Sequence, residues 1–166
     1  MTARAALLVS APLIALALPA SAQEPETILD QKEWSVGGVR MGGDQYFTCA
    51  ATDASHSDDS LWLQVTELAS QNLINEVSVM HPGDTQATAA ILQIGGDRFV
   101  LSVNDGDRFS AAASDGNRIV AVMLKSATLT LQFEGASAPK PYGYDLTEFP
   151  KAYAAMVQHC RAPAKL

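Results

Sequence analysis

The sequence predicts an all-β domain, either a β-sandwich or a small barrel, with a short internal helix and a C-terminal amphipathic helix. Three features predict this class. Many short segments alternate polar and apolar residues, which is the period of a half-buried strand. Clusters of glycine, asparagine and aspartate separate these segments at short intervals, as turns do. Only near the end of the chain does the apolar spacing become that of a helix.

The strand pattern recurs along most of the chain in segments rich in β-branched and aromatic residues, which favour strands. The clearest hairpin turns through Gly95, Gly96 and Asp97. A polar loop is expected at residues 52–60, and a loop containing two prolines at 135–141. We expect strands at residues 33–36, 45–51, 61–65, 75–80, 89–94, 98–103, 108–111 and 127–133.

Residues 118–125 fit either a buried strand or a short helix. We expect the helix, because Asp115 or Asn117 can cap it and because Ile119 and Met123 would share one face.

The C-terminal helix is predicted from apolar residues that recur at helical spacing. Thr147 is the expected N-cap, and Pro150 is acceptable because it lies in the first turn. The apolar face consists of Phe149, Ala152, Tyr153, Met156 and Cys160.

The first 22 residues have the pattern of a signal peptide. A short apolar run precedes Ala20-Ser21-Ala22, a small-x-small cleavage site that would leave Gln23 as the new N-terminus. We therefore expect a periplasmic or secreted protein with no membrane span in the mature chain. The predicted organisation is a signal peptide at 1–22, a flexible arm at 23–31 and a single domain at 32–166.

Cys49 and Cys160 are the only two cysteines of the chain. Export to an oxidising compartment favours pairing, and both residues fall on the apolar phase of their predicted elements. We predict that they form one disulfide.

The chain carries 18 acidic and 11 basic residues, for a formal net charge of −7. Such a charge repels phosphate backbones, so nucleic acid is not an expected partner. An anionic membrane surface is disfavoured for the same reason. The expected partner is a protein or another envelope component.

The three histidines do not predict a catalytic site. His56 precedes Ser57, Asp58, Asp59 and Ser60, which together offer the residue types of a serine nucleophile triad. Neighbours in sequence rarely reach triad geometry, however, and the chain lacks a glycine-x-serine-x-glycine motif, so a solvated loop is favoured.

The other two histidines have structural explanations. His81 precedes Pro82 and is expected in a turn. His159, at the end of the predicted helix, suits the helix dipole.

Neither metal ligands nor a cofactor motif stands out. The run 104–107, Asn-Asp-Gly-Asp, hints at an oxygen-ligand loop but lacks the glutamate and spacing of a calcium hand, and a hairpin turn is favoured. The aromatic residues Trp34, Tyr46, Phe47 and Trp62 could line a ligand pocket, although aromatics on alternating strands usually form core. We expect no catalytic residues, no cofactor and no metal site.

Several segments resemble the invasion-associated locus B family of exported bacterial proteins. Trp34 opens the first predicted strand and Cys49 follows shortly after it, as in that family. Residues 119–125, followed by Leu129, resemble its aliphatic, methionine and lysine segment. Residues 146–152 resemble its closing leucine-x-glycine-phenylalanine motif.

This chain departs from the family in two ways: Glu148 replaces the motif glycine, and the mid-chain cysteine pair is absent. The resemblance implies an association with host-cell invasion and no catalytic residues. We therefore expect an exported, non-enzymatic binding or envelope-associated protein. The alternative is a small-molecule carrier or an inhibitor of a secreted hydrolase.

Overall fold

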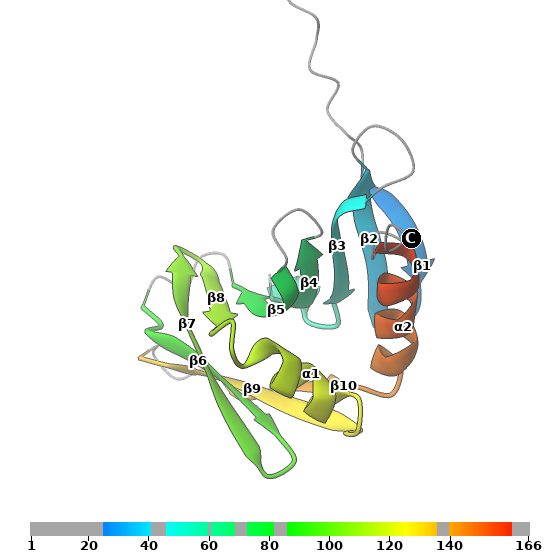
Figure 1. Cartoon of the computed structure of the whole chain (residues 1–166). Helices are drawn as coiled ribbons and strands as arrows, with labels where there is room; N and C mark the ends of the chain where they lie inside the picture. Colours follow the sequence, from blue (N-terminus) through cyan, green and yellow to red (C-terminus); the bar gives the residue numbers. More distant parts are fainter. Residues whose placement is uncertain are drawn as a thin grey trace, which may run out of the picture.

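The computed structural model describes residues 25–40, 46–59, 61–68, 73–81, 86–135 and 140–160. The predicted signal peptide lies outside these residues. Within them, ten antiparallel strands form one open sheet in the order β1-β2-β3-β4-β5-β8-β7-β6-β9-β10 (Figure 1). The strands are β1 (Glu26–Asp30), β2 (Trp34–Arg40), β3 (Tyr46–Asp53), β4 (Trp62–Leu68), β5 (Leu73–Met80), β6 (Ala89–Ile94), β7 (Asp97–Asp105), β8 (Arg108–Ala111), β9 (Thr128–Glu134) and β10 (Tyr142–Asp145). The helical elements are the 3₁₀ turn η1 (Ser57–Asp59), α1 (Gly116–Met123) and α2 (Phe149–Cys160).

The predicted class, all-β with a short internal helix and a C-terminal helix, is confirmed. The sheet is single, as in a barrel, but it stays open between β1 and β10. Figure 1 shows that its two halves curve toward each other, as the sheets of a sandwich face each other. The architecture therefore lies between the two predicted forms. Right-handed strand twist, added up over ten strands, produces such curvature.

The core fills the inner face of the curved sheet. Every second residue of β9 is buried and its neighbours are exposed, which is the alternation predicted for this strand. The helix α2 packs against β1, β2 and β3, where the ring of Phe149 lies 4.7 Å from that of Trp34. The largest fully buried side chains include Trp34, Leu61, Leu63, Leu92, Ile94, Leu101, Phe109, Ile119, Met123, Leu129, Tyr144 and Phe149.

The predicted disulfide is confirmed. Cys49 in β3 and Cys160 at the end of α2 are bonded, with their Cα atoms 5.9 Å apart, and both are buried. The bond fixes the last turn of the helix to the sheet.

A second junction joins both helices to β5 through Asn75. This buried residue has φ of +59°, a conformation that asparagine tolerates better than most residues. Its Nδ2 donates to Oδ1 of Asn117 in α1 at 2.6 Å, and its Oδ1 accepts a bond from the Tyr153 hydroxyl of α2 at 3.0 Å. The Asn75 side chain thus positions α1 and α2 relative to the sheet.

Two strands differ from the predicted layout, and both lie at a sheet edge. β1 falls within residues 23–31, which we predicted to be a flexible arm. No period of two marks β1, because its side chains are exposed or half-buried. β10 was not predicted, because it has only four residues and one of them, Gly143, is a poor strand former.

Two smaller predictions were wrong. Asp53 does not lie in the polar loop but ends β3 and is fully buried. Thr147 does not cap α2: the first helical bonds are accepted by the Glu148 carbonyl, and the Thr147 hydroxyl donates to Asp145 instead.

Candidate functional site

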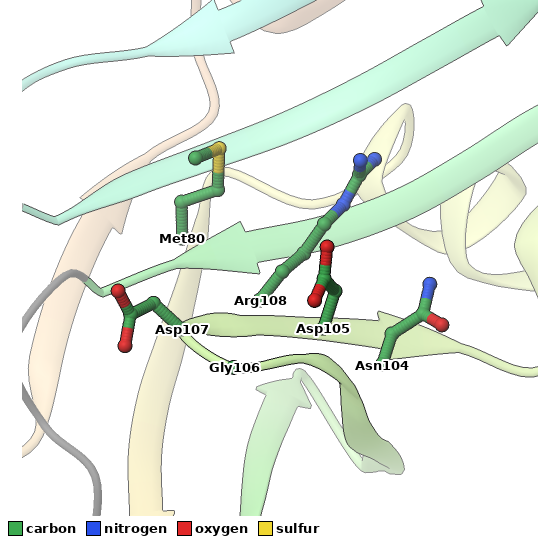
Figure 2. Close-up of a pocket in the computed structure, with 6 residues that line it drawn as sticks. All are labelled: Met80, Asn104, Asp105, Gly106, Asp107 and Arg108. Atoms are coloured by element: carbon green, nitrogen blue, oxygen red, sulfur yellow. The ribbon is translucent and has the colours of Figure 1, made fainter.

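A pocket of about 610 Å³ lies on the outer side of the sheet, where β7 turns into β8. Figure 2 shows Met80 of β5 and Arg108 of β8 projecting to the same side, with Asp105 next to Arg108. Asp107 lies nearer to Met80 in the same view. The lining residues are Met80, Asn104, Asp105, Gly106, Asp107 and Arg108.

The charge of Arg108 is directed away from the pocket's carboxylates. Its guanidinium lies 3.2 Å from Oε1 of Glu76 and donates to the Ser78 hydroxyl at 3.2 Å. Within the described part of the chain, neither Asp105 nor Asp107 forms an ion pair. The pocket therefore presents two carboxylates that form no ion pair with a described basic side chain, although Arg108 lies next to Asp105.

An aromatic residue lies beside Met80, one of the residues that line the pocket. Trp62 of β4 is paired directly with Met80 of β5, and residues opposite each other on adjacent strands point to the same face. The Trp62 side chain is half-buried. We call Trp62, Met80, Asp105, Asp107 and Arg108 the outer patch.

The outer patch includes residues that the sequence analysis weighed separately. The 104–107 run forms a hairpin turn, as favoured, and its acidic residues line the pocket. Among the described residues, no group of three or more His, Cys, Asp or Glu side chains is placed to hold a metal ion.

The four aromatic residues do not form one cluster. Trp34 is a core residue, whereas Trp62 lies on the opposite face of the sheet. The side chains of Tyr46 and Phe47 lie outside the described part of the structure. The sequence could not separate these roles, because the face on which a residue lies depends on strand register.

The open edge at β10 contacts the start of β2 and the end of β3. The imidazole Nε2 of His56 donates to the Gly143 carbonyl at 2.7 Å, and the indole Nε1 of Trp34 donates to the Asp145 carbonyl at 3.0 Å. These are backbone acceptors of a strand that has a strand neighbour only in β9. We call these contacts of His56 and Trp34 with β10 the seam.

His56 lies in an exposed loop, as expected, but its side chain also contacts β10. Its ring is half-buried and lies edge-on to Tyr142 and Tyr144, with centroid distances of 5.3 and 4.9 Å. Among the described residues, the ring contacts Gly143, Tyr142 and Tyr144 of β10 rather than Ser57 or Asp58.

Two unpartnered polar atoms lie close to the seam. Asp53 is 0 % exposed, and its Oδ1 accepts a hydrogen bond from the Ser55 backbone N–H at 2.7 Å, whereas Oδ2 has no partner. The hydroxyl of Tyr144, a residue 2 % exposed, also has no partner. Buried polar atoms are almost always hydrogen-bonded, so these two are exceptional.

Replacing His56 by alanine is expected to destabilise the protein by about 1 to 3 kcal/mol. The change removes a hydrogen bond to the Gly143 carbonyl and two edge-on ring contacts. Urea unfolding followed by circular dichroism measures the loss. Asp59→Ala, an exposed change in the same turn, is the control and should be near neutral. Equal stability of the two variants would contradict this role of His56.

The other histidines lie apart from the seam. The His81 ring packs edge-on against Phe133 at 5.0 Å, and the turn predicted after it lies at residues 82–85, outside the described residues. His159 lies exposed in the last turn of α2, where the sequence placed it.

No helix among the described residues is long and apolar enough to cross a membrane. No protein-family model matches this chain, and no curated protein or solved structure is significantly similar to it. The resemblance to the invasion-associated locus B family therefore stays a prediction.

Proposed function

We propose that this is an exported, non-enzymatic binding protein that receives another macromolecule on the outer patch. The disulfide supports export, because such bonds persist in oxidising compartments. The predicted signal peptide supports it independently. A role in the envelope or in host interaction rests on the family resemblance alone.

The observation that carries the proposal is the chemistry of the outer patch. A methionine and an arginine line a hollow with two carboxylates that form no ion pair among the described residues, and a half-buried tryptophan lies beside the methionine. Tryptophan, arginine and methionine are enriched in protein interfaces, where tryptophan and arginine often dominate the binding energy. On an ordinary exposed surface, residues of these types would lie apart from one another rather than grouped at one hollow.

The charge of the patch indicates the kind of partner. Asp105 and Asp107 would attract a lysine or arginine side chain, while Met80 and Trp62 would cover its aliphatic stem. The net charge of −7 would speed association with a basic surface. We therefore propose a partner that presents a basic segment.

The pocket volume also favours the alternative of a small-molecule carrier. Sites for small ligands usually measure about 300 to 1,000 Å³, and this pocket falls within that range. A native mass spectrum of protein purified from its own compartment distinguishes the two, because a carrier would retain a bound small molecule and a partner-binding protein would not.

Asp105→Lys is expected to abolish capture of the partner from envelope extract. The change reverses the charge in the pocket at an exposed strand position, where it should leave the fold intact. Pull-down with the mature domain, followed by a titration with the captured protein, measures the effect. We expect at least a tenfold loss of affinity, which corresponds to one strong charged contact.

Asp30→Lys is the matched control. It makes the same charge change at an exposed position of β1, the edge strand of the sheet, which is separated from β7 and β8 by other strands. Capture that survives in Asp30→Lys and is lost in Asp105→Lys supports the outer patch. Equal capture by both variants would contradict it.

A further inference from the structure

A buried carboxyl lies at the inner end of the seam. Asp53 pairs with Trp34 of β2 and Leu63 of β4, so its side chain faces the core, as that of Ala51 does. A carboxyl group that water cannot reach needs hydrogen-bond partners for both oxygens, and Oδ2 of Asp53 has none. The neutral form of such a group is far less costly to bury than the ionised form.

The same buried region contains the Tyr144 hydroxyl, which also lacks a partner. Tyr144 lies in β10 between Gly143 and Asp145, whose carbonyls bind His56 and Trp34, and Asp53 is the strand partner of Trp34, so the two groups lie on the two sides of the seam. Burial raises the pKa of Tyr144, and the neighbouring charge of Asp53 raises it further. The phenol therefore stays neutral and adds no charge of its own to this buried region.

We propose that the seam is a proton-controlled closure, which is shut while the Asp53 carboxyl is protonated and loosens when this carboxyl ionises. The titratable groups near Asp53 are Glu33 just before β2, His56 in the loop after β3, and Tyr144 of β10. Ionisation would place a charge in the core, and separation of β10 would let water reach that charge.

The electrostatic surroundings agree with this direction. Burial raises the pKa of the Asp53 carboxyl above its ordinary value of 3.8, and Glu33 adds to the rise. The hydrogen bonds from Ser55 and the charge of His56 oppose the rise. A carboxyl whose pKa is higher in the closed state than in the open state binds its proton more tightly in the closed state. The closed seam is therefore favoured below pH 3.8 and loses this advantage as pH rises through the folded-state pKa.

Hydrogen–deuterium exchange of the β10 backbone tests the closure. Exchange is measured from about pH 4 to pH 8 and corrected for the chemical rate, with the β6–β7 hairpin as internal reference. In the wild type, the corrected opening of β10 should be greater at high pH than at low pH. The total increase should be about tenfold for each pKa unit by which the closed-state pKa of Asp53 exceeds its open-state pKa. In Asp53→Asn the corrected opening should not depend on pH, because the amide keeps an acceptor for Ser55 but does not titrate.

Asp58→Asn, the same chemical change at an exposed residue of η1, is the matched control and should behave as the wild type. If Asp53→Asn does not fold, Glu33→Gln replaces it, and the opening midpoint should move to lower pH because a charge that raises the pKa is gone. The proposal is overturned by equal pH dependence in Asp53→Asn and wild type, by an unshifted midpoint in Glu33→Gln, or by equal opening of the reference hairpin.

Discussion

Replacing Gly116 by alanine is expected to lower the free energy of unfolding by about 3 to 5 kcal/mol. A Cβ at this position would lie 2.0 Å from the backbone oxygen of Asn75 and 3.1 Å from its carbonyl carbon. Both are backbone atoms, so the contact cannot be relieved by rotating a side chain. The first turn of α1 would have to move away from β5.

The effect should extend beyond α1, because Asn75 also accepts the hydrogen bond of Tyr153 in α2. Tyr153→Phe removes that bond alone and should cost only about 1 kcal/mol. Denaturant unfolding of both variants separates the steric effect from the hydrogen bond.

Gly96→Ala is the control for Gly116→Ala. A Cβ at Gly96 would meet nothing within 4 Å, and the residue lies in the turn between β6 and β7. We expect this variant to be within about 0.5 kcal/mol of the wild type. A Gly116→Ala protein as stable as Gly96→Ala would show that α1 does not depend on its close approach to Asn75.

The sequence predicted the longer elements with a buried face and missed the two edge strands β1 and β10. β9 alternates strictly along its length, so its period was visible. β1 is an exposed edge strand, and its residues do not show this alternation. The helix α1 could be predicted from its capping residues and apolar face, although its closest contact, that of Gly116 with Asn75, joins distant parts of the chain.

The candidate sites were harder to predict than the fold. The acidic run at 104–107 was visible, but Met80 and Trp62 join it only through the pairing of β4, β5 and β8. β5 pairs with β8 rather than with β6, and no local sequence pattern predicts this pairing. Asp53 resembled its polar neighbours in sequence and is buried because β3 extends two residues beyond its expected end and pairs Asp53 with Trp34 and Leu63.

Replacing both cysteines by alanine is expected to be the other large effect. Cys49 and Cys160 are 111 residues apart, and closing a loop of this length restricts the unfolded chain by about 4 to 5 kcal/mol at room temperature. A compact denatured state would make the measured loss smaller. Denaturant unfolding of Cys49→Ala/Cys160→Ala measures it, and the reduced wild type should match the double variant.

The loss of stability should be unevenly distributed along α2. Phe149 packs against Trp34, and Ala152 and Met156 are buried, so the first turns of the helix should stay docked without the disulfide. The last turn, which ends at Cys160, should fray because the bond is its main link to β3. Hydrogen exchange should therefore speed up near Cys160 and change little near Phe149. Two free thiols per chain in denatured, unreduced protein would contradict the prediction, and so would a disulfide-linked dimer on a non-reducing gel.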